Sequence, residues 1–253
     1  MPSTPARASL LGLARSIGLY YGIPFRARRM ARFYSELIPE HALCFDIGAH
    51  AGNRIRCWRR LGARVVAVEP QPDFVRLLKL LYGRDGQVTI VEAAVGGSMG
   101  TVRLHVSKRT PTVTTVSREW IDRVRDTAGF RGVEWTEGEE VPMTTLQRLI
   151  ELHGVPQFVK IDVEGYEREA LEGLRTPVPA LSFEYLPAAR QTALACVDRL
   201  AALGDYRYNW SSGESHRFGA ERWLDAGAIR RFIEALPEDE DSGDVYARLA
   251  APT

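Results

Sequence analysis

The segment Cys44–Pro70, CFDIGAHAGNRIRCWRRLGARVVAVEP, reads as a β-strand, a glycine turn, a helix and a second strand. The apolar run Leu43–Phe45 predicts a short buried strand that ends at Asp46. Asn53–Leu61 has apolar residues at helical spacing, and Val65–Val68 predicts the next strand. Open parallel sheets bind ligands at the carboxyl ends of their strands. The segment therefore predicts one βαβ unit that holds a nucleoside.

The turn and the second strand end carry the polar and glycine residues of this unit. Gly48 permits a tight turn with positive φ, and Gly52 lets the following helix pack close to the strand. Glu69 lies 23 residues after Asp46. At that position an acid can accept hydrogen bonds from two ribose hydroxyls. We therefore expect Glu69 to bind the ribose of a nucleoside cofactor.

The middle of the turn distinguishes two classes of cofactor. A dinucleotide site uses G-x-G-x-x-G so that the backbone can approach a pyrophosphate. Here the run is Gly48-Ala49-His50-Ala51-Gly52, with an imidazole where the second glycine would stand. S-adenosylmethionine has no phosphate and does not need that close approach. The spacing therefore favours S-adenosylmethionine over a nicotinamide dinucleotide.

A second segment, FVKIDVEGYE at Phe158–Glu167, also ends a buried strand in polar residues. Asp162 and Glu164 follow the strand, and Glu184 ends the later apolar run LSFEY at Leu181–Tyr185. Because strand ends in such a sheet meet at one edge, these acids are expected near the cofactor turn.

These motifs resemble the FkbM family of S-adenosylmethionine-dependent methyltransferases. Six stretches match in order across roughly residues 43–186: FDIGAHAGN, VVAVEPQP, EAAVG, VPMTTLQRLI, FVKIDVEGYEREALEGL and LSFEY. The resemblance implies that Glu92 and Ala93 lie near adenine. With the turn, it predicts cofactor contacts from Asp46, Gly48, Ala49, His50, Gly52, Asn53, Glu69, Pro70, Glu92, Ala93 and Asp162.

Several of these residues also allow a plainer interpretation. Asp46 would contact the methionine amine directly or through another group, or else cap the following helix. His50 would bond the cofactor carboxylate or face solvent. Asn53 would serve as a helix cap, and Glu92 as a surface acid.

The fold implied is α/β: a Rossmann-like, doubly wound, mostly parallel seven-stranded sheet of the class I methyltransferase type. We expect an N-terminal helical segment or lid at 1–40 and the catalytic domain at 41–253. Thr101–Val106 and Val141–Leu146 predict two added strands that pair. These strands belong to an insert at 101–145. Between them Ser107–Gly138 lacks clear periodicity and is expected to be a substrate loop or lid.

The N-terminus is unusually basic. Before Glu36 there is no acid, whereas arginines and apolar residues alternate through the segment. Such a segment can pack on the catalytic domain as a helix or lid, lie on an anionic membrane, or form a disordered leader. A cleaved signal peptide fits less well because Arg15 interrupts the apolar stretch.

Composition limits the remaining classes. The 253 residues are 45% hydrophobic and 26% charged, which supports one well-packed domain. A net charge of +1 argues against general nucleic-acid binding. Cys44, Cys57 and Cys196 lack C-x-x-C spacing, which indicates reduced thiols in a cytoplasmic protein. No apolar run approaches the length of a transmembrane helix. The number of subunits is left open.

Methyl transfer from a sulfonium is an in-line displacement, so the protein chiefly positions donor and acceptor. A hydroxyl acceptor on a small molecule, sugar or natural product must also lose a proton. Asp162, Glu164 and Glu184 are the expected catalytic acids, as a general base or as ligands of Mg²⁺. Each acid can instead be a buried group bonded to Lys160 or to loop amides.

Three functions remain open from the residues. The first is an O-methyltransferase, with N-methylation not excluded. The second is a nicotinamide-dependent oxidoreductase, against which His50 and the absence of a Tyr-x-x-x-Lys pair both count. The third is a non-catalytic module that binds a nucleoside.

Overall fold

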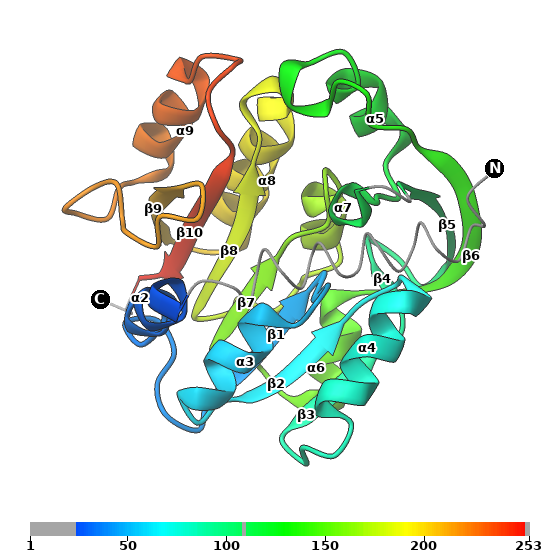
Figure 1. Cartoon of the computed structure of the whole chain (residues 1–253). Coiled ribbons are helices and arrows are strands. Elements are labelled where there is room, and N and C mark those ends of the chain that lie inside the picture. Colours follow the sequence, from blue (N-terminus) through cyan, green and yellow to red (C-terminus); the bar gives the residue numbers. More distant parts are fainter. Residues whose placement is uncertain (1–23, 108–109, 251–253) are drawn as a thin grey trace.

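A computed structural model describes residues 24–107 and 110–250 and shows a seven-stranded sheet at its centre (Figure 1). In spatial order the strands are β3 (Val88–Val91), β2 (Arg64–Val68), β1 (Leu43–Ile47), β7 (Phe158–Ile161), β8 (Ala180–Tyr185), β10 (Gly243–Leu249) and β9 (Tyr206–Ser212). Only β10 runs antiparallel to its neighbours in this sheet. The predicted α/β fold with a mostly parallel seven-stranded sheet is confirmed.

Helices cover both faces of the sheet. Apolar side chains of α2 (Pro24–Tyr34), α3 (Asn53–Arg60) and α4 (Pro72–Tyr82) pack with Cys44 and Val65 on one face. On the other, α6 (Leu146–His153), α7 (Glu167–Glu172), α8 (Arg190–Leu203) and α9 (Ala226–Ala235) bury the alternate strand residues. Successive strand residues point to opposite faces. Two apolar layers therefore fix the direction of every polar side chain on these strands.

The chain order reverses between β1 and β7. From β1 it proceeds to β2 and β3 on one side, and from β7 to β8 on the other. The loops after β1 and β7 consequently diverge and leave a crevice at the carboxyl ends of the strands, where doubly wound folds bind ligands.

The predicted added strands pair in a second, three-stranded sheet. Its order is β4 (Ala94–Val95), β6 (Thr136–Thr144), β5 (Gly100–Val106), and β5 runs antiparallel to β6. The strand expected at Val141–Leu146 begins earlier and ends at Thr144. It ends there because the Thr145 hydroxyl accepts the Arg148 amide at 3.0 Å and caps α6.

The insert between β5 and β6 is more ordered than its sequence predicts. It contains two short 3₁₀ turns, η1 (Pro111–Val113) and η2 (Ala128–Phe130), and the helix α5 (Arg118–Val124). Ser117 caps α5, and Trp120 is buried against neighbouring aromatic rings. A helix of seven residues is too short to give a clear periodic pattern.

Part of the predicted N-terminal segment, residues 1–23, lies outside the described residues. The following helix α2 packs against α3, with Met30, Phe33 and Tyr34 buried. Tyr34 contacts both Trp58 of α3 and Phe158 of β7 edge-to-face. Within the described residues, no helix is long and apolar enough to cross a membrane.

Candidate active site

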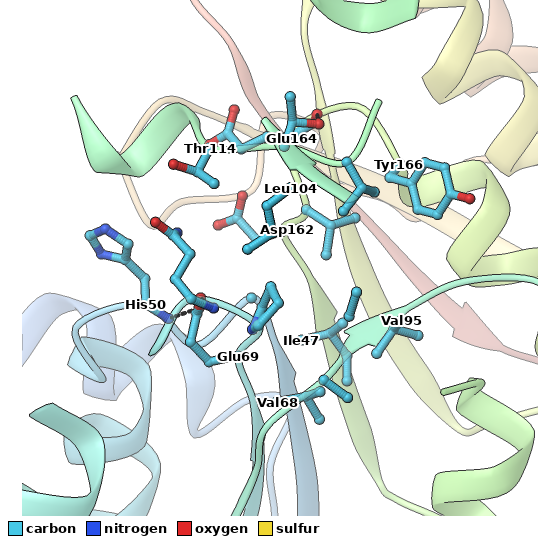
Figure 2. A pocket seen from close by; sticks show the side chains of 18 of the residues that line it. Ile47, His50, Val68, Glu69, Val95, Leu104, Thr114, Asp162, Glu164 and Tyr166 are labelled. Atoms are coloured by element: carbon cyan, nitrogen blue, oxygen red, sulfur yellow. Dashed lines mark hydrogen bonds between the residues drawn. The ribbon is translucent and has the colours of Figure 1, made fainter. Parts of the chain in front are cut away.

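A cavity of about 760 Å³ lies at the carboxyl ends of β1, β2 and β7 (Figure 2). Its lining combines apolar walls with a few polar groups, as in small-molecule sites of proteins. The lining includes Ile47 at the end of β1 and Gly48 directly after it, Glu69 after β2, and Asp162 after β7. The two sequence segments therefore meet in one cavity, as strand topology requires.

Gly48 brings the two loops together. Its φ is +78°, and an added Cβ would lie 1.9 Å from the carbonyl oxygen of Asp162. The Gly48 amide donates to the Val68 carbonyl at 2.9 Å, which ties the turn to β2 as well. The glycine is thus required by its conformation and by the close approach of another backbone.

Replacing Gly48 with alanine is expected to lower the free energy of unfolding by at least about 3 kcal/mol, because it adds a clash to backbone strain. The change is measured by chemical denaturation. Gly86→Ala is the matched control, since no atom lies within 4 Å of its added Cβ. That control is expected to stay within about 0.5 kcal/mol of the native protein. Equal effects of the two substitutions would contradict this role of the turn.

Glu69 is 2% exposed and held by two backbone amides. One carboxylate oxygen accepts the His50 amide and the other accepts the Gln71 amide, each at 2.8 Å. Burial raises the pKa of Glu69 to about 7, although these two bonds act in the opposite direction. Each oxygen retains a lone pair that can accept a further hydrogen bond. The carboxylate is therefore preorganised to accept two hydroxyl donors.

His50 forms the side wall of the turn. Its φ is +46°, and its ring lies 3.8 Å from the ring of Phe74, centroid to centroid. Burial lowers its pKa to about 4, so the imidazole is neutral at pH 7. Asn53 and Pro70 also line the cavity. The side-chain oxygen of Asn53 accepts a hydrogen bond from the backbone amide of Arg54.

The other predicted cofactor residues differ in where they lie. Ala49 and Gly52 are outside the cavity wall: the Ala49 amide donates to the Val68 carbonyl, and Gly52 packs against Leu78 and Tyr82. Ala93 lines the cavity, whereas the neighbouring Glu92 forms an ion pair with Lys79 at the surface.

Asp46 does not line the cavity, and its side chain lies on the face of the sheet that α3 covers. It is fully buried, and neither carboxylate oxygen has a hydrogen-bond partner within the described residues. Lys160 is its neighbour on β7, and the positive charge of Arg54 acts on it from α3. Burial nevertheless dominates and raises its pKa to about 7.

The three predicted catalytic acids come together. Carboxylate oxygens of Asp162, Glu164 and Glu184 lie within 4.8 Å of one another. Asp162 and Glu164 line the cavity; Glu184, on β8, stands behind them. Such a cluster can take a proton or bind a divalent cation through its oxygens.

The acids differ in their electrostatic surroundings. Arg54 donates to Asp162 at 2.8 Å, and the buried Lys160 lies 3.6 Å from the same oxygen. Burial alone would raise the pKa of Asp162, but the charges of Lys160 and Arg54 hold it below its usual value. Burial and the charge of Glu184 instead raise the pKa of Glu164. Burial and the charge of Asp162 do the same for Glu184.

The insert supplies the opposite wall of the cavity with Leu104, Thr112, Thr114, Thr115 and Val116. The Thr115 hydroxyl donates to the Glu164 carbonyl at 2.7 Å. This bond holds Glu164 at φ +52°, a conformation uncommon for a residue with a side chain. The backbone of the acid is therefore fixed by the insert that faces it.

Arg54 and Gln71 line the cavity but were not predicted as site residues from the sequence. Arg54 follows the turn directly, so its place at the helix start next to Asn53 was an available indication. Gln71 lines the cavity and joins Glu69 to the Pro111 carbonyl of the insert. That contact depends on the tertiary position of the insert, for which the sequence has no local pattern.

Comparison with known proteins identifies the family. The family model described as the methyltransferase FkbM domain matches residues 46–236. The chain belongs to this family. It is therefore an S-adenosylmethionine-dependent methyltransferase, and the predicted family is confirmed.

A curated relative of this FkbM methyltransferase is hexuronic acid methyltransferase AglP of Haloferax volcanii. The two are 29% identical over 154 residues, which is 60% of this chain and 58% of that protein. The match thus spans less than two thirds of the relative.

Solved structures that resemble the chain include an O-methyltransferase from Bacillus cereus in complex with S-adenosylhomocysteine (SAH) and a TehB-like methyltransferase from Corynebacterium glutamicum. The first is 11% identical with a TM-score of 0.48, covering 99% of this chain and 92% of that one. The second is 9% identical with a TM-score of 0.49, covering 98% and 100%.

The cavity of this FkbM methyltransferase suits the cofactor of its family. Polar groups that fit a ribose, Glu69 above all, stand beside apolar walls from Val68, Ala93 and Val95 that suit an adenine ring. Apolar walls with a few fixed polar groups are typical of nucleoside sites.

Asp46→Asn is expected to stabilise this FkbM methyltransferase more at high pH than at low pH. Because the folded protein raises the Asp46 pKa from 3.8 to about 7, protonated Asp46 favours folding, and that contribution is lost as pH rises through 7. The gain from asparagine should grow by about 2.5 kcal/mol between pH 5 and pH 8. Denaturation of the protein without ligand measures it. The exposed Asp126, replaced by asparagine, serves as a surface control; a gain independent of pH would refute the prediction.

Proposed function

We propose that this methyltransferase transfers a methyl group to a hydroxyl oxygen of a sugar acid or a related glycosidic acceptor. The observation that carries the proposal is the pairing of Glu164, at the cavity wall, with Glu184 behind it. Burial and neighbouring acids raise the pKa of both carboxyl groups, so each binds a proton more strongly than an ordinary carboxylate, which suits a proton acceptor. The sugar acid is suggested by the name of the relative AglP.

When bound, S-adenosylmethionine supplies an electrophilic methyl group on a sulfonium. The residues proposed to hold it are Glu69 at the ribose, Gly48 and His50 at the turn, and Val68 and Ala93 at the adenine. In this proposal Asp46 does not contact the cofactor and acts on the bound cofactor only through its charge. These residues chiefly orient the cofactor, because an in-line displacement depends on alignment more than on chemical assistance.

Glu164 is proposed as the general base. The acceptor hydroxyl would give its proton to the Glu164 carboxylate. Bound S-adenosylmethionine would supply the methyl group to the hydroxyl oxygen, and its sulfur–methyl bond would break to leave neutral S-adenosylhomocysteine. Glu184 keeps the proton affinity of Glu164 high through its adjacent charge. Asp162 stays ionised through Arg54 and Lys160, which suits it to orient cationic or hydroxyl groups rather than to take a proton.

Mg²⁺ held by Asp162, Glu164 and Glu184 is the second candidate arrangement, since their oxygens lie within 4.8 Å of one another. A cation there would lower the pKa of the acceptor hydroxyl directly. We favour the general base over the metal site, because the positive charges of Arg54 and Lys160 already compensate the negative charge of Asp162. Activity unchanged by EDTA supports the base; loss of activity that Mg²⁺ restores supports the metal.

The test uses the purified full chain, S-adenosylmethionine and methyl glycosides of glucuronic and galacturonic acid, with methyl glucoside for comparison. Formation of SAH together with a methylated uronoside is expected. A methyl group that resists mild alkali is an ether, as the proposal requires. One that alkali releases is a carboxylate ester, which would contradict a hydroxyl acceptor. No turnover of any sugar by protein that binds S-adenosylmethionine would overturn the proposed acceptor class.

A further inference from the structure

A buried lysine lies next to the acids of the cavity. Lys160, on β7, is 0% exposed, although lysines are almost never fully buried unless they are paired. Its ammonium group lies 3.6 Å from Asp162 and 2.6 Å from Asp244. Burial would lower the pKa of Lys160, but the charges of Asp162 and Asp244 raise it, so the ammonium group is charged at pH 7. The lysine therefore places a fixed positive charge beside the cavity.

Two acids share this charge, and only one of them lines the cavity. Asp162 lines it and accepts a hydrogen bond from Arg54 at 2.8 Å, through the same oxygen that faces Lys160. Asp244 lies on β10, which β8 separates from β7 (Figure 1), and it does not line the cavity. One of its oxygens faces Lys160, and the other accepts the Tyr246 hydroxyl at 3.1 Å. Asp244 is thus held in place as the closer partner of Lys160.

The charges of these four groups balance only because Asp244 is present. Arg54 and Lys160 supply two positive charges, and Asp162 and Asp244 supply two negative ones. Without Asp244, both cations would act on Asp162 alone, and one positive charge beside the cavity would be uncompensated. Solvent screens buried charges only weakly, so such an excess acts on any ion that the cavity binds.

The cofactor differs from its product by one charge. The sulfonium of S-adenosylmethionine is a cation, and loss of the methyl group leaves the uncharged thioether of SAH. The ribose and the adenine are the same in both molecules. The charge beside the cavity can therefore distinguish the substrate from the product where the shape of the cavity cannot.

We propose that Asp244 is a positioning residue for this cavity: acting through Lys160, it favours the binding of S-adenosylmethionine over that of SAH. Because Asp244 balances the charge of Lys160, no excess positive charge repels the sulfonium, and the charge of Asp162 stays available to the cavity. A preference of this kind favours the exchange of product for new substrate. The role depends on the proposed placement of S-adenosylmethionine in the cavity and not on the identity of the acceptor.

The test is calorimetric titration of the native chain and of Asp244→Asn with S-adenosylmethionine and with SAH at pH 8. At this pH Asp46, whose pKa burial raises to about 7, is mostly ionised in both proteins. The asparagine keeps the size of the side chain and removes its charge. S-adenosylmethionine is expected to bind about tenfold more weakly to the variant, and SAH less than about twofold more weakly.

Lys160→Met should shift the preference in the opposite direction, because it removes the positive charge and leaves that of Asp244. This variant decides the question if Asp244→Asn does not fold, which thermal melting shows. The double variant Lys160→Met, Asp244→Asn removes both charges and should return the ratio of the two dissociation constants to within about twofold of the native ratio. Asp205→Asn is the matched control, since it removes the same charge from an exposed acid paired with Arg207, and it should leave both affinities unchanged.

Equal weakening of both ligands in Asp244→Asn would show a purely structural role and would overturn the inference. An unchanged ratio in Lys160→Met would also overturn it, as would a double variant that keeps the altered ratio of Asp244→Asn. Failure of the native chain to bind either ligand would overturn the placement of the cofactor as well, which distinguishes that result from a failure of Asp244 alone.

Discussion

Glu69→Ala is expected to weaken S-adenosylmethionine binding by roughly 10²- to 10⁴-fold in calorimetric titration. The proposed ribose contact uses two hydrogen bonds to a charged group, each worth about 1.5–3 kcal/mol. In the structure the amides of His50 and Gln71 orient both oxygens of Glu69, so the side chain loses little conformational entropy when the cofactor binds. SAH, which carries the same ribose, should lose affinity in the same proportion.

Glu92→Ala is the matched control for this change. Glu92 also follows a strand of the same sheet edge, β3, but it faces Lys79 at the surface and does not line the cavity. Its removal should leave affinity within about twofold. Melting of both variants separates lost contacts from lost folding, because Glu69 also ties two loop amides. An unchanged affinity of Glu69→Ala for S-adenosylmethionine would contradict the assignment of Glu69 to the ribose.

Glu164→Gln is expected to lower kcat by 10²- to 10⁴-fold on a uronoside acceptor, the usual range for a missing general base. Affinity for S-adenosylmethionine should change little, since the proposed role begins at the acceptor. The glutamine keeps the size of the side chain and the backbone position that Thr115 holds. Glu172→Gln, at a surface acid paired with Arg168, is the control and should keep full activity.

Glu184→Gln distinguishes a neighbouring charge from a second base. The negative charge of Glu184 raises the pKa of Glu164, so its removal should move the acid limb of the kcat profile to lower pH. The maximal rate should fall less than in Glu164→Gln. An unchanged acid limb would contradict the coupling of the two carboxyls. Full turnover in both variants would remove the base and the metal proposals together.

The sheet could be predicted because its signals are local. Apolar strands with a glycine turn and a terminal acid recur in the segments around Asp46 and Asp162, and parallel pairing then places both strand ends at one edge. The position of Glu69 follows from the same rule. The burial of Asp46 outside the cavity does not follow from it, because a short strand that is buried on both faces has no alternating pattern in its sequence.

The structure of the insert could be predicted only in part from local sequence patterns. Its β-hairpin alternates and was expected, but the loop between the strands reaches the cavity through contacts distant in sequence. Thr115 meets Glu164, and Gln71 meets Pro111. Arg54 is similar, since its partner Asp162 lies 108 residues further along the chain. Such pairings are fixed by the tertiary fold and by the need to compensate buried charge.

The central claim is that the cavity at the ends of β1, β2 and β7 holds S-adenosylmethionine. Calorimetric titration of the purified protein with S-adenosylmethionine and SAH, with NADH and NADPH as controls, tests it most directly. We predict micromolar binding of the first two and none of the nicotinamides, because His50 occupies the position where a pyrophosphate site needs glycine. Binding of a nicotinamide dinucleotide alone would contradict the account.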